Sequence, residues 1–196
     1  MSGATLMPWE ILETKEIFAD EPWVKLSVQR VRLPDGRIVD NYYQIKTMDF
    51  AVIFARTPDG NIILERHYRH GVGKVCLTLP AGSLEKDEKP LTAAKRELLE
   101  ETGYASDDWQ SLGSFIGSAN QGYSRSHMFI ANKAQRIGKP HSGDLEETEL
   151  VILPPKEVIY LAQQGEIAAV SNVAAIAMAL NPSFTGKPND KRGHTG

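Results

Sequence analysis

The chain has 196 residues, 41% of them hydrophobic and 24% charged, which is the composition of an ordinary globular protein. This length allows one substantial hydrophobic core with a small appendage, or two small domains. The formal net charge of −3 gives no electrostatic basis for nonspecific nucleic-acid binding, so we expect no nucleic acid as a partner. The single cysteine, Cys76, excludes an intramolecular disulfide, and we expect its side chain to be buried in a strand.

The N-terminal stretch, residues 1–16, lacks the basic flank and apolar run of a secretory signal peptide. No apolar run in the chain approaches the roughly 20 residues that a membrane-spanning helix needs. We therefore expect a soluble, cytoplasmic protein that has no membrane partner.

Residues 1–48 predict a small appendage made of strands. Apolar and polar residues alternate over 22–33, the sequence PDGR at 34–37 is typical of a turn, and a second strand is predicted over 38–45. A hairpin or short meander of this size is not stable alone in water. We expect it to pack on the main domain or on another subunit, and we predict that it makes the protein a homodimer.

From residue 49 to residue 181 the pattern predicts the main domain. A helix is expected to begin near Pro90 and to end before Gly103, because proline favours the first turn and glycine the position after the last. A C-terminal helix is expected with Ser171 as its N-cap. The other predicted elements are strands at 50–56, 62–69, 75–82, 109–118, 124–134 and 150–154, and a helix at 155–165. Residues 182–196 have the composition of a disordered tail.

The order of these elements is strands, one helix, more strands and then helices. A doubly wound parallel sheet would require regular alternation of strands and helices, so that class is excluded. We predict an α/β fold in the broad sense, with helices on both faces of a mixed sheet and a strand-rich N-terminal appendage.

Three carboxylates, those of Glu97, Glu100 and Glu101, are predicted within about one turn of the helix. Carboxylates at this spacing repel one another by a few tenths of a kcal/mol per pair. They border an apolar stripe formed by Leu91, Ala94 and Leu98. Hard oxygen ligands in such a group suit Mg²⁺, with Mn²⁺ as an alternative. The competing interpretation is a solvated charged face, in which Lys95 and Arg96 partly compensate the acids.

The full spacing favours the metal site. It consists of a glycine, five residues, a glutamate, seven residues, and then Arg-Glu-apolar-x-Glu-Glu-x-Gly, running from Gly82 through Glu88 and Arg96 to Gly103. This pattern resembles the Nudix box at all eight defining positions, and the one departure is Tyr104, where an aliphatic residue is usual. The resemblance implies a Nudix-type α/β/α sandwich and hydrolysis of a nucleoside diphosphate linked to a further group.

The same resemblance implies roles for individual residues. Arg96 is expected to tie the loop before the helix to the helix, while Glu85 and Glu88 in that loop could add further metal contacts. Gly82 is expected to border the substrate. The implied metal ligands are Glu97, Glu100, Glu101 and the carbonyl of Ala81, and Glu97 and Glu101 also count as catalytic residues.

Residues 65–82 and the N-terminal appendage are similar to the ADP-ribose pyrophosphatase branch of that family. By position, Arg69 and Arg125 are expected to contact the substrate, and a cation at Arg69 would complement a pyrophosphate. Trp23 matches a tryptophan that stacks on the nucleobase from the partner subunit, although a core or interface role is an equal alternative. The general base is expected to be Glu146, with Glu147 second.

Three departures from that branch, Ala119, Ser124 and Thr78, affect the expected substrate. ADP-ribose is the leading nucleotide-sugar substrate, and GDP-mannose or another nucleotide sugar is the alternative. Two other classes of function stay open: a pyrophosphohydrolase acting on RNA ends, and a noncatalytic nucleotide-binding module. The intact acidic triad argues against the second of these, and the net negative charge argues against the first.

Overall fold

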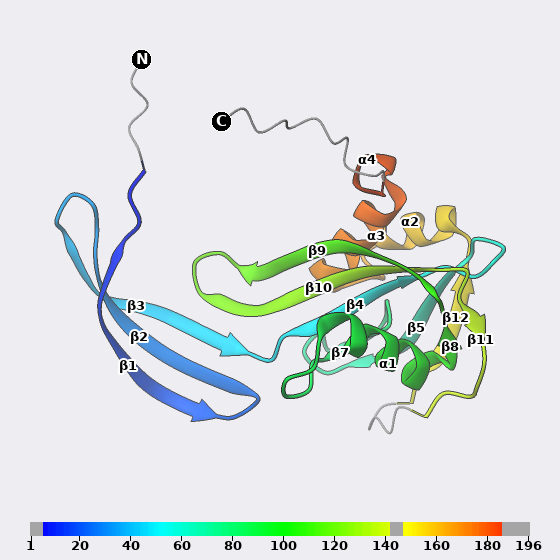
Figure 1. Cartoon of the computed structure of the whole chain (residues 1–196), viewed down its shortest axis with the longest axis horizontal. Coiled ribbons are helices and arrows are strands. Elements are labelled where there is room, and N and C mark those ends of the chain that lie inside the picture. The colour runs from blue at the N-terminus through cyan, green and yellow to red at the C-terminus, as the bar shows by residue number, and fades with distance from the viewer. Residues whose placement is uncertain (1–5, 142–146, 186–196) are drawn as a thin grey trace, which may run out of the picture. The chain divides into compact units, whose positions relative to one another are not determined.

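The structure is a computed structural model and describes residues 6–141 and 147–185. The chain divides into two compact units. The first comprises Met1–Asp49 and Phe115–Arg125, and the second comprises Phe50–Ser114 and Ser126–Gly196. Figure 1 shows the elements of both units in chain order.

The first unit contains an antiparallel meander. Its strands are β1 (Glu10–Asp20), β2 (Val24–Arg32) and β3 (Ile38–Thr47), with β2 in the middle. Tight turns join them, and Gly36, with φ of 88°, occupies the second of these turns as predicted from PDGR. The alternation of apolar and polar residues would normally give such a sheet one buried face. In these three strands, however, only Val31 is buried.

The second unit contains the remaining elements. Its strands are β4 (Phe50–Ala55), β5 (Ile62–Arg69), β6 (Lys74–Thr78), β7 (Ala81–Ser83), β8 (Tyr104–Ala105), β11 (Gln135–Arg136) and β12 (Glu149–Leu153). The strands β9 (Asp108–Ser118) and β10 (Gly122–Asn132) contribute residues to both units. The helices are α1 (Pro90–Thr102), α2 (Pro155–Gln163), α3 (Val170–Leu180) and α4 (Pro182–Thr185).

The sheet around β4 is mixed. Strand β10 pairs with β4 in parallel, from Ser126 opposite Phe50 to Ala131 opposite Ala55, whereas β7 pairs with β4 antiparallel. Strands β12, β5 and β6 form a separate antiparallel sheet in that order, and β8 pairs with β11. The mixture of directions confirms the predicted mixed sheet.

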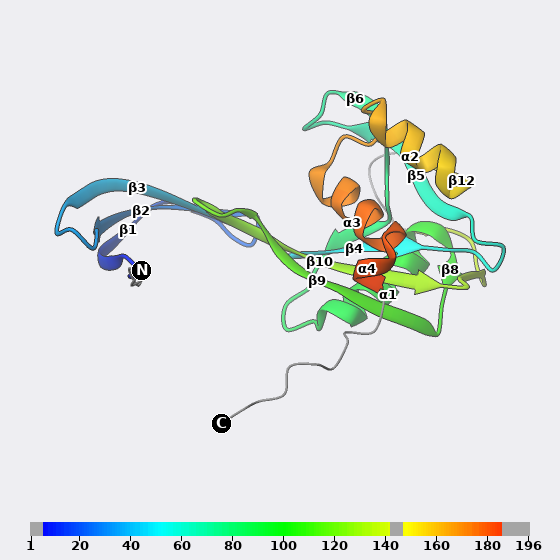
Figure 2. The same cartoon turned by 90° about the horizontal axis from the view of Figure 1, so that it is seen from above.

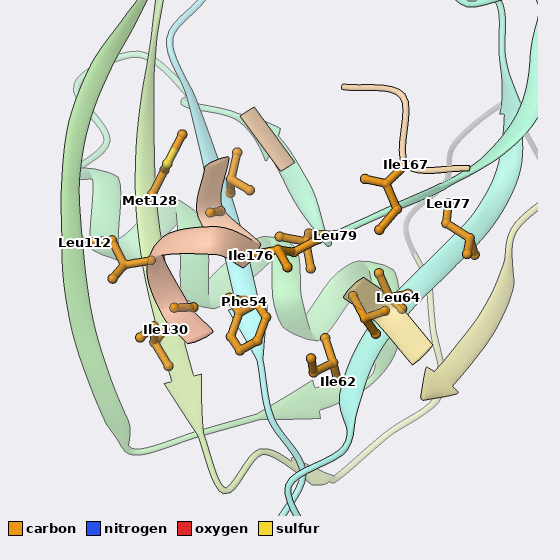
Figure 3. Close-up of a cluster of buried hydrophobic side chains, with 14 residues drawn as sticks. Phe54, Ile62, Leu64, Leu77, Leu79, Leu112, Met128, Ile130, Ile167 and Ile176 are labelled. Atoms are coloured by element: carbon orange, nitrogen blue, oxygen red, sulfur yellow. The ribbon is translucent and has the colours of Figure 1, made fainter. Parts of the chain in front are cut away.

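Helices cover both faces of β4. Successive side chains of a strand point to opposite faces, and in β4 both sets of side chains are apolar and, from Ala51 onward, buried. Ala51, Ile53 and Ala55 belong to the core cluster that includes the buried residues of α1. Val52 and Phe54 belong to the cluster that includes residues of α2 and α3. Figure 2 shows α1 on one side of β4 and β10 and α3 on the other, and Figure 3 shows the second cluster around Phe54. The predicted arrangement of helices on both faces is therefore confirmed.

Several local predictions differ from the structure. Helix α3 begins at Val170, with Ala169 as its N-cap and no side-chain cap, so the assignment of Ser171 to that position is wrong. The strand predicted over 75–82 is interrupted: β6 ends at Thr78, and Ala81 and Gly82 of the Pro-Ala-Gly segment begin β7, which pairs with β4. Residues 182–185, within the predicted tail, form α4, and the rest of that tail lies outside the described residues. Cys76 is buried in β6, as predicted.

Candidate active site

Helix α1 carries the acidic cluster, and its ends are defined by the residues that the sequence indicated. Pro90 occupies the first turn, and Gly103 ends the helix in the left-handed conformation (φ 74°) and donates its N–H to Leu99 O at 2.8 Å. Ala93, Ala94 and Leu98 are buried toward β4. Leu91, predicted to lie in this apolar stripe, is instead 39% exposed, whereas Ala93 is buried.

Two carboxylates of this helix and one from the loop before it surround the guanidinium of Arg96. Its Nη1 donates to Glu97 Oε1 at 2.7 Å and to Glu100 Oε2 at 3.3 Å. Its Nε and Nη2 donate to the two oxygens of Glu88 at 3.0 and 2.8 Å, and Nη2 also donates to Ser83 O at 3.1 Å. Arg96 thus ties the loop before α1 to the helix. Its positive charge also reduces the electrostatic repulsion among these closely spaced carboxylates.

The proton affinities of this group follow from the same contacts. The paired hydrogen bonds from Arg96 lower the pKa of Glu88 below its ordinary value. The Glu88 carboxylate, followed by Glu97 and Glu100, raises the pKa of Arg96, which therefore stays charged. Three carboxylates face one guanidinium, so the group keeps a net negative charge that attracts cations.

The first two residues of β7 lie directly against two of these acids. Ala81 donates its backbone N–H to Glu101 Oε2 at 2.9 Å. A Cβ built on Gly82 would overlap the carboxyl group of Glu97, so this carboxyl group occupies the space that a side chain would fill. The fold therefore places Glu97 and Glu101 against consecutive backbone positions of one strand.

A buried asparagine that the sequence analysis missed binds the backbone of Leu79, two residues before β7. Asn172 in α3 is 4% exposed, and its Oδ1 accepts the backbone N–H of Leu79 at 2.6 Å. The signal in the sequence was a side-chain amide in a largely apolar helix. A buried polar group needs a hydrogen-bond partner, so such an amide indicates a contact with another part of the chain. The partner itself could not be found from spacing, since it lies 93 positions away.

A second buried polar group lies on β5 and β6. Thr78 Oγ1 and His67 Nε2 are 2.9 Å apart, and Glu65 lies opposite Thr78 in the strand register. All three side chains are buried. Thr78, one of the three departures from the expected pattern, therefore shares a hydrogen bond with His67.

The donor set of the site fits a hard divalent cation, since it consists of glutamate oxygens next to a backbone turn. Within residues 6–141 and 147–185, no three acidic, histidine or cysteine side chains converge as a metal-binding group. The reason is visible in the contacts, because Glu97 and Glu100 point to Arg96 while Glu101 points to Ala81.

The other predicted site residues are distributed over both units. Arg69 is half-buried at the end of β5. Glu147 is exposed just before β12, and Glu146 lies outside the described residues. Trp23, 65% exposed between β1 and β2, and Arg125, half-buried in β10, belong to the first unit.

The helices in the described part of the chain include none with the length and apolar character needed to cross a membrane.

Comparison with known proteins identifies the class of this chain. Residues 46–172 match the family model described as "NUDIX domain", and residues 9–45 match "Nucleoside diphosphate sugar hydrolase N-terminal domain". The chain belongs to the Nudix family and is a Nudix hydrolase, as the spacing of the acidic motif predicted.

Named relatives make the likeness more specific. The chain is 30% identical to an ADP-ribose pyrophosphatase of Mycobacterium tuberculosis over 90% of its own length and 83% of the relative's. It is 27% identical to an ADP-ribose pyrophosphatase of Bacillus subtilis, covering 78% and 83% of the two chains. It is also 32% identical to a methanol dehydrogenase activator of Bacillus methanolicus, covering 72% and 75%.

A solved structure titled "Crystal structure of ADP compounds hydrolase" shares the fold. The TM-score is 0.78 at 20% sequence identity, and the match covers 89% of this chain and 93% of the other. At this identity the likeness concerns the fold, and it agrees with the mixed sheet and helices described above.

Proposed function

We propose that the protein hydrolyses the pyrophosphate bond of a nucleoside diphosphate sugar, with ADP-ribose as the leading substrate. The observation that carries this proposal is the acidic group of α1, in which Glu97 binds Arg96 and lies against Gly82 and Glu101 accepts the Ala81 N–H. Relatives named ADP-ribose pyrophosphatase at 27% and 30% identity support the choice of substrate. Water attacks one phosphorus and the other phosphate leaves, giving a nucleoside monophosphate and a sugar phosphate.

The proposed cofactor is Mg²⁺, with Mn²⁺ as an alternative. Glu97, Glu100, Glu101 and the Ala81 carbonyl would hold it, and when bound it would neutralise charge on the pyrophosphate. Arg96 limits the excess negative charge of these acids before any cation binds.

The remaining roles follow from charge and position. Arg69 would bind a phosphate oxygen through its guanidinium. A loop carboxylate, Glu146 or Glu147, would accept the proton of the attacking water. Gly82 would border the substrate next to the Glu97 carboxyl group, which occupies the space that a side chain would fill.

The exposed aromatic and aliphatic side chains of β1–β3 support a homodimer. Ile11, Phe18, Trp23 and Tyr43 are each about half exposed or more, which is unusual for apolar residues in a sheet. In a dimer Trp23 would stack on the nucleobase bound by the partner subunit or would lie in the interface. A cytoplasmic location completes the proposal.

A substrate screen tests the proposed chemistry. ADP-ribose, GDP-mannose, UDP-glucose, NADH and a 5′-capped RNA would each be incubated with the full chain and Mg²⁺, and the products would be separated by chromatography. We expect AMP and ribose phosphate from ADP-ribose at the highest kcat/KM. Release of GMP from GDP-mannose at a higher kcat/KM would replace the leading substrate. Cleavage of the RNA cap with inert nucleotide sugars would contradict the proposal.

A further inference from the structure

The first unit contains a groove in which cationic side chains outnumber carboxylates. The groove has a volume of about 350 Å³ and is lined by residues of β2, β3 and the 116–125 segment. Lys25, Lys46 and Arg125 line it, and Asp49 is the carboxylate among the lining residues. This excess of positive charge contrasts with the net charge of −3 of the whole chain.

Two of the three cations form no ion pair with a carboxylate of the described residues. Lys25 is ion-paired with Glu16 at 2.5 Å. Between residues 6 and 185, apart from the gap at 142–146, no ion pair involves Lys46 or the guanidinium of Arg125. Arg125 is half-buried, and a partly desolvated guanidinium without a counter-charge is unfavourable. An anionic ligand would supply the missing partner.

Backbone contacts hold the walls of the groove in place. Ile45 donates its N–H to Gln121 O at 2.8 Å, and Arg125 donates its backbone N–H to Asp49 Oδ1 at 2.7 Å. Gly122 has φ of 87°, and a Cβ there would lie only 3.3 Å from Ile45 O. The cations are therefore carried by two strand segments whose spacing is fixed, which is the preorganisation that a binding site requires.

The rest of the lining suits a nucleotide better than a bare anion. Tyr123 is 45% exposed and offers a ring for base stacking, and Ser27 and Gln44 offer polar groups for hydrogen bonds. The volume lies at the lower end of the range of about 300–1,000 Å³ that is typical of small-molecule sites. A mononucleotide or one nucleotide half of a larger molecule fits this size.

We propose that this groove binds a phosphate-bearing nucleotide, with Lys46 and Arg125 contacting the phosphate and Tyr123 contacting the base. Fixed cations would bind the anion here, so the site would work without the metal proposed for α1. The nucleotide has two sources that share this chemistry: a nucleotide portion of the substrate, or a separate effector such as AMP.

Calorimetric titration of the full chain tests the proposal. Inorganic phosphate and AMP would be titrated at low ionic strength into the Glu101→Gln variant, with EDTA present so that neither metal nor turnover contributes. We expect both to bind, AMP more tightly because of its base, and both to bind more weakly as salt is raised. The double variant Lys46→Gln/Arg125→Gln should bind AMP at least about tenfold more weakly.

The control is Lys15→Gln, which removes an exposed cation of β1 that does not line this groove. This variant should bind AMP as the parent does. If circular dichroism shows that the double variant does not fold, AMP affinity is measured in Lys46→Gln alone. Lys46 is exposed, so this single change should not disturb folding. The proposal fails if the parent binds neither probe at millimolar concentration, if removal of the groove cations has no effect, or if Lys15→Gln weakens binding equally.

A competition arm distinguishes the two sources. Added ADP-ribose that displaces AMP in the metal-free protein assigns the groove to the substrate, and AMP binding that persists assigns it to an effector. Both results require the site to exist. Because binding is measured without turnover, a protein that proves inactive on every nucleotide sugar would leave this inference standing.

Discussion

Two glycines flank the acidic segment, and their missing side chains serve different purposes. At Gly82 a Cβ would overlap the carboxyl end of Glu97, which is the movable end of a flexible side chain. At Gly103 a Cβ would approach backbone atoms of Gly138, and the φ of 74° is itself unfavourable for other residues. The first glycine leaves room for the Glu97 carboxylate, and the second allows the helix to end.

Gly82→Ala should therefore affect activity more than stability. The new methyl group would displace the Glu97 carboxylate, and displacement of a reacting-site group by about 1 Å can cost about a hundredfold in rate. We expect kcat to fall at least about tenfold while the free energy of unfolding in urea changes by less than about 1 kcal/mol. The comparison variant Gly103→Ala should instead affect stability more than kcat, with a loss of about 1–2 kcal/mol in the free energy of unfolding. A Gly82→Ala protein with parental kcat would contradict this role.

The hydrogen bond of Asn172 should contribute to the free energy of unfolding. Asn172→Leu removes the acceptor of the Leu79 N–H and leaves that buried donor without a partner, which costs about 1–3 kcal/mol. Equilibrium urea unfolding should show this loss. Asn172→Asp, which keeps an acceptor oxygen at the same position, should lose less of this hydrogen bond. Equal stability of Asn172→Leu and the parent would show that this hydrogen bond does not stabilise the fold.

The loop before α1 and the helix itself are joined by the pair of Glu88 and Arg96. The pKa of Glu88 is lowered in the folded state, so its contribution to stability is complete above the ordinary pKa of a glutamate, about 4.3. That contribution is lost as the pH falls through the lower folded pKa. Glu88→Gln should therefore destabilise the protein by about 1–3 kcal/mol at pH 7. The difference from the parent should shrink as the pH is lowered from about 5, as measured by urea unfolding at a series of pH values. A difference that stays constant down to pH 3 would contradict this account.

The elements were predictable to different degrees for physical reasons. The ends of α1 followed from Pro90 and Gly103, because both residues act locally through their own backbone. The start of α3 was predicted wrongly, since its capping position holds Ala169 and tertiary packing decides where that helix begins. The strand predicted over 75–82 is divided into β6 and β7, and this division was not predicted, because the pairing of β7 with β4 depends on residues about 30 positions earlier in the chain.

The site shows the same division between local and distant causes. Spacing along one helix brought Glu97, Glu100 and Glu101 together. The directions of their carboxylates were not predictable, because Arg96 and the Ala81 N–H decide them. The contact of Asn172 with Leu79 was also beyond prediction, since only the packing of α3 creates it.

At the scale of the whole molecule, the meander of β1–β3 stands out because Val31 is the one buried residue of its three strands. If it forms the interface of a homodimer, sedimentation equilibrium at micromolar concentration should give twice the chain mass of 21.7 kDa. Phe18→Glu should shift this mass toward that of one chain, because it places a charge among the exposed apolar residues. The control Ile137→Glu changes an exposed apolar residue of the second unit and should leave the mass unchanged. A parental mass of one chain would exclude the dimer.

The central claim is that the acids of α1 form the hydrolytic site, and Glu101→Gln tests it most directly. This change keeps the size of the side chain, and an amide oxygen can still accept the Ala81 N–H, so circular dichroism and the melting temperature should stay near those of the parent. The control Glu157→Gln neutralises an exposed acid in the first turn of α2. We predict that Mg²⁺-dependent kcat on ADP-ribose falls by at least about a hundredfold in Glu101→Gln, and by less than about twofold in Glu157→Gln. Unchanged turnover in folded Glu101→Gln would contradict the account.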